Sequence, residues 1–247
     1  MKDNTVLITG ASGGIGMALV EKFASLGYDV LGSMRSEKDD VLQKWSEISS
    51  KYGVSVEPVY FDLANEDSVK NALAEHLKNK EKPIGILVNN AGIPYGATSM
   101  MTPMKDLKNV MQINFFGAIY VSQLVAKSMI RRKNGSIVNI SSVGGIETTQ
   151  GYLAYGSSKA ALIHATGIMA KELASAGIRV NAVAPGLTDT QMGHFKSDEE
   201  LRKTLDRTPA GRMAKPEEIA ETVAFLCSEG ASYITGEVVA VDGGRTA

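Results

Sequence analysis

The fold is indicated near the amino end by the stretch VLITGASGGIG, Val6–Gly16. Its apolar start predicts a short buried strand, and an amphipathic helical pattern runs from about Gly14 to Ser25. The glycines between them permit a turn too tight for residues that carry side chains. A strand, a glycine turn and a helix in direct succession are typical of the start of a βαβ unit.

The same alternation of short apolar runs and longer amphipathic segments continues to the end of the chain. Strands that are apolar on both faces are typical of a parallel sheet covered by helices on both sides. No repeat and no Gly/Pro/Ser-rich linker divides the chain. We therefore predict an α/β fold, with one doubly wound Rossmann-type parallel sheet and helices on both faces, in a single domain over residues 1–247. The further expected strands are Val30–Leu31, Val54–Phe61, Ile84–Val88, Ser136–Ile140, Arg179–Ala184 and Glu237–Val241.

The charge balance offers no support for two classes of partner. The 247 residues include 26 basic and 27 acidic side chains, so the formal net charge is −1. A charge this small offers no electrostatic attraction to nucleic acid or to an anionic membrane. With 44% hydrophobic and 21% charged residues, the composition is that of a globular domain.

Several features favour a cytoplasmic location. Cys227 is the only cysteine, so no intramolecular disulfide can form, and its place at the end of the expected helix Ile219–Leu226 favours packing over catalysis. We find no apolar stretch that approaches the roughly 20 residues needed to span a bilayer. The start, Met1–Asn4, lacks the apolar core of a signal peptide.

The glycine turn favours binding of a diphosphate. Backbone N–H groups at a helix N-terminus attract anions, and we expect Gly10 to allow the turn, Gly14 the close approach and Gly16 the packing of helix on strand. A purely structural glycine turn is the alternative. The Gly-Lys-Ser/Thr ending of a phosphate-loop nucleotidase is missing.

Two further groups of residues suggest catalysis. Asn89–Gly92 follows a strand, and Ser141–Ser142 follows the next strand but precedes Tyr155 and Lys159. The i, i+4 spacing of Tyr155 and Lys159 places both side chains on one helix face, where an ammonium would lower the pKa of the phenol. Alone, such a pair is equally typical of a helix surface.

Together these motifs are similar to those of the short-chain dehydrogenase/reductase family, in its compact branch, over essentially the whole chain. The resemblance implies hydride transfer between a nicotinamide dinucleotide and a carbonyl or alcohol. The motifs that carry it are Thr9-Gly10-(x3)-Gly14-x-Gly16, Asn89-Asn90-Ala91-Gly92, Asn114, Ser142, Tyr155-(x3)-Lys159 and Pro185-Gly186.

The resemblance implies a role for four catalytic residues. Tyr155 would protonate the carbonyl oxygen during reduction, and Ser142 would hydrogen-bond the same oxygen. Lys159 would hold the nicotinamide ribose and lower the pKa of Tyr155. Asn114 would interrupt its helix and position a water in a proton relay.

The resemblance also implies a cofactor site and favours NADP(H). No acid stands at the end of the second strand to accept from a ribose 2′-hydroxyl; Met34 lies there with Arg35 beside it, and an Arg can bind a 2′-phosphate. A solvated Arg35 is the alternative, and Gly13 stands where many NADP-dependent relatives have a basic residue. Asp62 would contact adenine, or instead cap the next helix. Either Thr188 or Thr190 would donate its hydroxyl to the cofactor, and the sequence leaves open which of the two does so. The implied cofactor residues are Gly10, Ser12, Gly13, Gly14, Ile15, Gly16, Ser33, Arg35, Asp62, Leu63, Asn90, Ala91, Gly92, Tyr155, Lys159, Pro185, Gly186, Thr188 and Thr190.

Within the family the chain resembles the 3-oxoacyl-(acyl-carrier-protein) reductases, which implies reduction of a 3-oxoacyl thioester. Arg131–Lys133 would dock an acidic carrier protein near the mouth of the site, or else form a solvated helix end. Ala176 stands where those enzymes usually have a second basic residue. An NAD(P)-dependent alcohol or sugar dehydrogenase and a non-catalytic dinucleotide sensor are the alternatives, although Ser142, Tyr155 and Lys159 are all present.

The remaining expectations concern the surroundings of the site. The polar segment of about residues 188–213 is predicted to be a substrate lid, and within it His194 is a surface residue or a substrate contact. The resemblance implies a homotetramer through helices of about Met104–Arg132 and Tyr155–Ser175 and through the C-terminal strand. We expect no metal site, since His76, His164, His194 and Cys227 show no ligand spacing. The expected substrate-pocket residues are Ile93, Tyr95, Gln150, Tyr152 and Met192.

Overall fold

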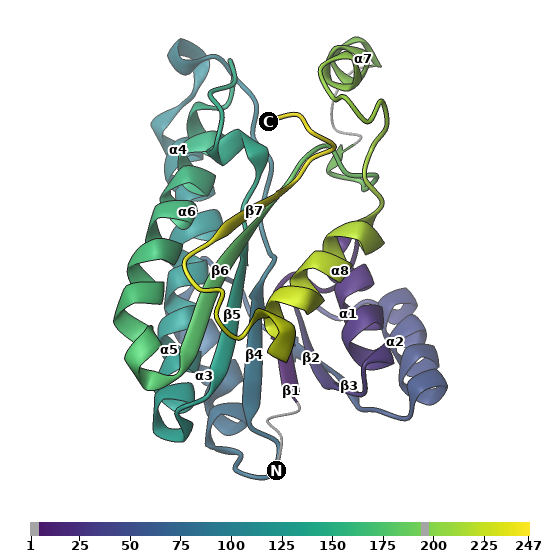
Figure 1. Ribbon diagram of the computed structural model, residues 1–247, viewed down its shortest axis with the longest axis vertical. Helices are drawn as coiled ribbons and strands as arrows, with labels where there is room; N and C mark the ends of the chain where they lie inside the picture. The colour runs from purple at the N-terminus through teal and green to yellow at the C-terminus, as the bar shows by residue number, and fades with distance from the viewer. Residues whose placement is uncertain (1–4, 194–197) are drawn as a thin grey trace.

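The computed structural model describes residues 5–193 and 198–247, which form a seven-stranded sheet flanked by helices on both faces (Figure 1). All strand pairs are parallel, in the order β3-β2-β1-β4-β5-β6-β7. The predicted fold class is confirmed, and each expected strand is present with small changes at its ends. The strands are β1 (Thr5–Ile8), β2 (Asp29–Met34), β3 (Val56–Tyr60), β4 (Ile84–Asn89), β5 (Gly135–Ile140), β6 (Ile178–Pro185) and β7 (Val238–Val241).

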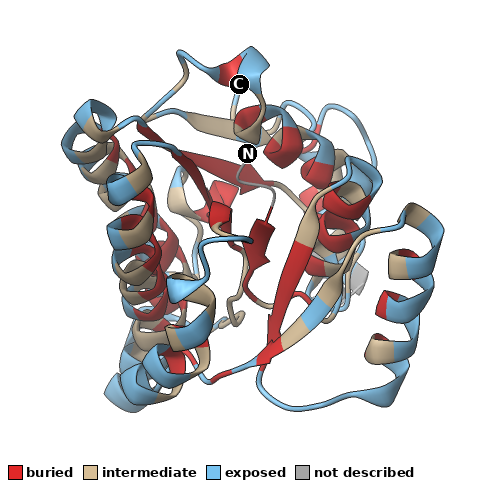
Figure 2. Ribbon diagram, turned by 90° about the horizontal axis from the view of Figure 1, so that it is seen from below, coloured by how far each residue is buried: buried red, intermediate tan, exposed pale blue. Residues whose placement is uncertain are grey.

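The helices divide between the two faces of the sheet. Helices α1, α2 and α8 share one buried cluster with the strands, and α3, α5 and α6 share the other. Burial is accordingly concentrated on the sheet and on the inner sides of the helices (Figure 2). The α-helices are α1 (Ile15–Ser25), α2 (Asp39–Tyr52), α3 (Glu66–Lys78), α4 (Met104–Met111), α5 (Ala118–Arg132), α6 (Leu153–Leu173), α7 (Asp198–Asp206) and α8 (Pro216–Cys227).

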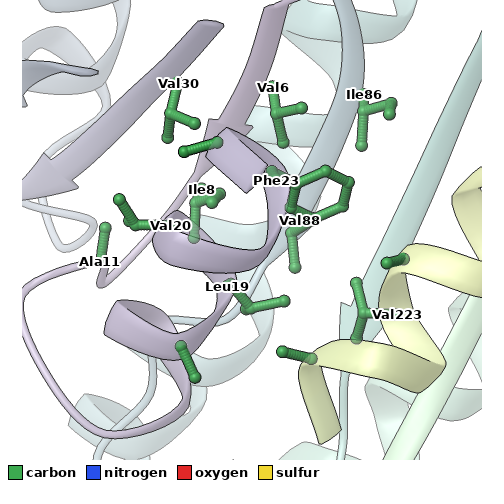
Figure 3. Close-up of a cluster of buried hydrophobic side chains, with 14 of the residues drawn as sticks. Val6, Ile8, Ala11, Leu19, Val20, Phe23, Val30, Ile86, Val88 and Val223 are labelled. Atoms are coloured by element: carbon green, nitrogen blue, oxygen red, sulfur yellow. The ribbon is translucent and has the colours of Figure 1, made fainter. Parts of the chain in front are cut away.

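Strand β1 shows why the strands are apolar throughout. Val6 and Ile8 point to the cluster under α1, where they meet Leu19 and Phe23 (Figure 3), whereas Leu7 belongs to the cluster on the opposite face. Burying one such side chain stabilises the fold by roughly 1.5–3 kcal/mol. Successive residues of one strand therefore supply two separate cores.

The strand order places a crevice between β1 and β4. The chain runs outward from β1 through β2 to β3, and then crosses back to continue from β4 through β7. At such a reversal the loops that leave neighbouring strands diverge, and ligands bind outside the carboxyl ends. The glycine turn after β1 and the Asn90–Gly92 segment after β4 lie on either side of this point.

The expectation that no apolar stretch approaches the length of a membrane span is wrong, whereas the expected helical segment of about Met104–Arg132 is present. Helices α4 and α5 join through a π-helical turn (Gln112–Gly117), and this segment, Met104–Arg132, is long and apolar enough by length and composition alone to cross a membrane. No charged residue lies between Lys108 and Lys127, which explains why the segment passes that test. In the fold its buried residues Val121 and Val125 pack in the sheet core, as in a core helix.

The basic cluster Arg131–Lys133 lies at the wrong edge of the sheet to form the mouth of a site within the same chain. Arg132 donates to the carbonyl of Ile84, the first residue of β4, at 2.6 Å, so the cluster is at the amino edge. Arg131 and Arg132 also donate to carbonyls of the last turn of α5, at 3.2 and 3.1 Å. The structure thus corrects the expected position and favours the helix-end alternative.

Cys227 is half-buried at the end of α8, and burial raises the pKa of its thiol to about 12. A thiol with that pKa stays protonated at neutral pH. The expectation that Cys227 packs against the core is confirmed.

A close contact between β2 and α2 yields a stability prediction. A Cβ added to Gly32 would collide with the buried indole of Trp45. We expect Gly32→Ala to lower the free energy of unfolding by about 1–3 kcal/mol, as overpacking of a core does. Denaturant unfolding measures this change.

The control is Gly167→Ala, since a Cβ at Gly167 in α6 meets nothing within 4 Å. That change should raise the free energy of unfolding by roughly 0.5–1 kcal/mol, because alanine favours the helix. Equal effects of the two substitutions would contradict the packing argument.

Candidate active site

The glycine turn after β1 is shaped by backbone conformation and close packing. Gly10 and Gly14 have positive φ of 64° and 53°, which residues with a Cβ rarely adopt. A Cβ at Gly16 would collide with the carbonyl of Gly10, so Gly16 packs the helix on the turn and does not line the cavity. A Cβ at Gly13 would meet nothing within 4 Å, so this residue borders open space.

Asn90 holds the glycine turn to the end of β4. Its side-chain amide donates to the carbonyls of Thr9 and Gly10, both at 3.0 Å. In return the hydroxyl of Thr9 accepts from the backbone N–H groups of Asn90 and Ala91, also at 3.0 Å. Asn90 therefore shapes the crevice with its side chain and lines it with its backbone.

The end of β2 adds two cations to the cavity. Ser33 is buried and its hydroxyl accepts from Gly10 N–H at 3.4 Å, while Met34 is buried with the α2 core. The exposed side chains of Arg35 and Lys38 line the cavity. Lys38 was missed by sequence reasoning, although its position three residues after Arg35 was a usable signal.

Asp62 occupies the cavity wall beyond β3. Its carboxylate accepts from Ala64 N–H at 2.9 Å, and the N-cap of α3 is Asn65, which accepts from Ser68 N–H. The alternative in which Asp62 caps that helix is therefore wrong.

The loop after β6 approaches the glycine turn. A Cβ at Gly14 would lie 3.0 Å from the Cγ2 of Thr190, and Thr190 Oγ1 accepts from Gly193 N–H at 3.1 Å. Thr188 is buried, and its hydroxyl donates a hydrogen bond to the carbonyl of Gly186 at 3.1 Å. Both threonines line the cavity, and Thr190 faces the glycine turn.

These loops enclose one cavity of about 880 Å³ at the carboxyl edge of the sheet. Every residue proposed for the cofactor lines it except Gly16, and the five expected substrate-pocket residues line it as well. The cofactor set on its wall is Gly10, Ser12, Gly13, Gly14, Ile15, Ser33, Arg35, Asp62, Leu63, Asn90, Ala91, Gly92, Tyr155, Lys159, Pro185, Gly186, Thr188 and Thr190.

Ser142, Tyr155 and Lys159 meet on one wall of the cavity. Ser142 lies two residues after the end of β5 and caps a short helix (Val143–Gly145), with its hydroxyl accepting from Gly144 N–H at 3.1 Å. Tyr155 and Lys159 lie on α6, and the buried Lys159 ammonium donates to the carbonyl of Ile140 at 2.8 Å. Helix α6 thus aims both side chains at the end of β5.

The electrostatics of this group differ from the expectation. Burial raises the pKa of Tyr155, although a hydrogen bond with Ser142 opposes the shift, and burial lowers the pKa of Lys159 to about 8. Desolvation therefore outweighs any effect of the lysine on the phenol in the described chain. The prediction of a lowered Tyr155 pKa is wrong here, and Tyr155 keeps its proton at neutral pH.

Asn114 lies behind this group and does not line the cavity. Its side-chain oxygen accepts from Ile93 N–H at 2.8 Å, and its amide donates to the Ile93 carbonyl and to Ser158 Oγ, both at 3.1 Å. The π-helical turn interrupts the helix at Asn114, as expected. Its place in a proton relay stays a prediction.

The segment expected to form a lid is anchored at its base. Thr188 pairs with Ala214 in an isolated β-bridge. Asp189 N–H donates to the carbonyl of Ala214, and Ala214 N–H donates to the carbonyl of Leu187, both at 2.9 Å. Beyond this base lies α7, from which Lys203 and Thr204 reach the cavity. His194 lies outside the described residues, and lid movement stays a prediction.

Arg245 is a cavity residue for which the sequence offered no signal. It reaches the wall from the tail after β7, about 100 positions from Ser142 along the chain. Among the described residues, no group of three or more His, Cys, Asp or Glu side chains is placed to hold a metal ion.

The cavity fits a dinucleotide with a phosphorylated ribose. The turn before α1 borders open space at Gly13, and it presents the positive end of the helix dipole to the cavity, as a diphosphate requires. Two cations stand at the end of β2, where a 2′-phosphate would lie. The residues present therefore agree in shape and charge with such a ligand.

The buried ammonium of Lys159 yields a pH prediction for the protein without ligand. Its pKa falls from 10.5 to about 8 on folding, so between these values the unfolded chain binds more protons than the folded chain. Stability contributed at this site therefore rises with pH through that window. We expect Lys159→Met to raise the free energy of unfolding at pH 7 and this advantage to shrink toward pH 10.

Denaturant unfolding at pH 7, 8.5 and 10 measures this difference. Lys44→Met, at an exposed position of α2, is the control and should show no such trend. If Lys159→Met raised the free energy of unfolding by the same amount at all three pH values, the lowered pKa of the buried ammonium would be refuted.

Comparisons with known proteins agree with this geometry. A family model described as enoyl-(acyl carrier protein) reductase matches residues 10–246. The chain is 42% identical to the 3-oxoacyl-(acyl-carrier-protein) reductase of Aquifex aeolicus, over 96% of this chain and 95% of that protein. It is also 42% identical to the enzyme of the same name from Thermotoga maritima, over 99% and 98% of the two chains.

Among solved structures, one from Beutenbergia cavernae carries the provisional name NAD(P)-dependent gluconate 5-dehydrogenase and holds NADP at low occupancy. It superposes with a TM-score of 0.91 at 34% identity, over 98% of this chain and 96% of the other. With its parallel sheet, its glycine turn and the group of Ser142, Tyr155 and Lys159, the chain belongs to the short-chain dehydrogenase/reductase family.

Proposed function

We propose that the protein is an NADPH-dependent reductase that converts a 3-oxoacyl thioester to the 3-hydroxyacyl thioester. The observation that carries this proposal is the placement of a protonated Tyr155 beside Ser142 on the wall of a cavity that also holds the glycine turn. The names of the relatives from Aquifex aeolicus and Thermotoga maritima support the substrate class.

Binding is assigned to the loops at the carboxyl edge. The N-terminal turn of α1 would bind the diphosphate, and Arg35 with Lys38 would bind the 2′-phosphate. Asp62 would contact the adenine end, and Lys159 would hold the ribose hydroxyls on the nicotinamide side. Bound NADPH would supply the hydride that the substrate carbonyl carbon accepts.

The proton side of the reaction is assigned to α6 and β5. Ser142 would donate a hydrogen bond to the substrate carbonyl oxygen and orient it. Tyr155 would then give its phenolic proton to that oxygen as the carbonyl becomes an alcohol. Burial supports this role, because a raised pKa keeps the phenol protonated until the oxygen gains negative charge. Lys159, buried in the same wall, would stabilise the phenolate left behind.

Three further proposals concern the setting of the enzyme. We propose that the acyl group is presented on an acyl carrier protein, and that the enzyme is cytoplasmic, with segment 188–213 as its lid. We also propose a homotetramer, since β7 is an edge strand whose residues are not fully buried, and since Phe116, Leu153 and Ile168 expose apolar side chains on or beside α5 and α6.

A sugar or alcohol dehydrogenase that works in the oxidative direction is the second candidate. The structural neighbour described as a gluconate 5-dehydrogenase favours it. The same residues would serve, with Tyr155 accepting the proton that it donates in reduction.

The test of the proposed function is NADPH consumption with an acetoacetyl thioester, compared with gluconate and NADP in the reverse assay. We expect turnover of the thioester, and a fall in kcat of about 10²–10⁴ in Tyr155→Phe, because the general acid is lost. NADPH affinity of that variant, measured by fluorescence, should change less than about twofold.

Tyr233→Phe is the matched control, since Tyr233 is fully exposed. Unchanged turnover in Tyr155→Phe would refute the catalytic role. Turnover of gluconate without turnover of the thioester would keep the catalytic roles and favour the second candidate.

The cations at the end of β2 yield a cofactor prediction. In Arg35→Gln/Lys38→Gln we expect the KM for NADPH to rise about 10–100-fold, because charge-assisted hydrogen bonds to a phosphate are lost. The KM for NADH should stay nearly constant. Steady-state kinetics with both nucleotides measure the change, with Lys44→Gln on the exposed side of α2 as control. Equal losses for the two nucleotides would refute recognition of the 2′-phosphate.

A further inference from the structure

Three segments that are far apart in the sequence meet beside the substrate end of the cavity. They are the loop Val143–Gln150 after β5, the turn Thr208–Gly211 before α8, and the tail Asp242–Thr246 after β7. Ala210 N–H donates to the carbonyl of Gly243 at 3.0 Å, and Arg245 reaches Glu147. In Figure 1 the tail crosses the carboxyl end of the sheet in yellow.

The contact between loop and tail is an ion pair with little exposure. Arg245 donates to Glu147 Oε1 through Nε at 2.9 Å and also through Nη2. The two side chains are only 8% and 21% exposed. Arg207 lies 4.0 Å from the other carboxylate oxygen. A guanidinium this buried needs its carboxylate, because an unpaired buried charge is strongly unfavourable.

Each partner of the pair is fixed to a rigid piece of backbone. Glu147 N–H donates to the carbonyl of Val143 at 2.9 Å. This bond holds Glu147 to the short helix Val143–Gly145, which Ser142 caps. On the other side, Asp242 accepts from Gly244 N–H at 3.0 Å and from Thr246 N–H at 2.9 Å, which folds the tail around Arg245. The ion pair therefore links the tail after β7 to the loop that carries Ser142.

We infer that Glu147 and Arg245 are positioning residues, whose ion pair fixes the Ser142 loop and closes the substrate end of the cavity. The pair sets the affinity for the acyl substrate and leaves the diphosphate and 2′-phosphate end of the dinucleotide site unaffected, because Arg35 and the glycine turn lie at β2 and β1, on the other side of β4. This inference rests on the proposed function only for the identity of the substrate.

The first measurement is steady-state kinetics of Glu147→Gln with NADPH and the acetoacetyl thioester. We expect the KM for the thioester to rise about tenfold, equivalent to about 1.4 kcal/mol, while the KM for NADPH changes less than about twofold. Arg245→Gln should have a smaller effect, because Glu147 keeps Arg207 at 4.0 Å whereas Glu147→Gln leaves a buried Arg245 without its carboxylate.

The double variant Glu147→Gln/Arg245→Gln tests whether the two residues act through each other. Coupled residues give non-additive effects, so the double variant should be no worse than Glu147→Gln alone. Hydrogen exchange supplies a readout independent of turnover. The amides of Gly145, Ile146 and Glu147, each bonded to a carbonyl of Ser142 or Val143 at 2.9 Å, should exchange faster in the single variants.

The control is Lys82→Gln, which removes the Lys82–Asp29 pair at 2.9 Å near the amino edge of the sheet. It should change neither the KM for the thioester nor exchange in the Ser142 loop. The inference is overturned by single variants that lower the melting temperature but leave both readouts at wild-type values. It is also overturned by multiplicative effects in the double variant, or by a parallel rise in the KM for NADPH.

Failure of the proposed function gives a different result. Wild-type protein would then leave the thioester unreduced, while exchange of the Ser142 loop in the variants would still show whether the pair holds that loop.

Discussion

The contact on which the site depends is the one between the loops that follow β1 and β4. Four hydrogen bonds cross between these loops: two join Asn90 to Thr9, one runs from Asn90 to the Gly10 carbonyl, and one runs from Ala91 N–H to the Thr9 hydroxyl. The contact works only because Gly10 lets Ala91 approach, where a Cβ would lie 2.8 Å from the Ala91 Cα. Strand order brings the two loops together, and these bonds hold the crevice at the width in which the glycine turn can face a ligand.

Desolvation dominates the chemistry of the opposite wall. Burial makes Tyr155 a weaker acid and Lys159 a stronger one than either is in water, so both shifts disfavour charge. A site with this bias holds a neutral phenol ready to donate a proton and bears the cost of a buried ammonium. The buried ammonium lowers the stability of the fold, and the same burial keeps the phenol protonated for catalysis. Such a loss of stability is common where charged groups are buried for function.

The substrate end is built differently from the dinucleotide end. The diphosphate part of the dinucleotide end is formed by the glycine turn and by backbone that follows directly from strands, whereas the substrate end is bordered by contacts among the Ser142 loop, the segment before α8 and the tail. These contacts include side chains, and Glu147 with Arg245 is the most buried ion pair among the described residues. Variation in these side chains would change the substrate end without disturbing the sheet.

The sequence by itself determined the parallel sheet, the glycine turn and the shared helix face of Tyr155 and Lys159, because apolar periodicity, glycine and helical spacing act over a few residues. The resemblance to the family added Ser142 to that pair. Only the tertiary structure decided the direction of the Tyr155 pKa shift and the arrival of Arg245 at the cavity. Burial and long-range contact depend on which strands become neighbours, and no local pattern records that. A local pattern could have indicated Lys38, which lies three residues after Arg35. No local pattern indicates Arg245, which reaches the cavity only through the fold.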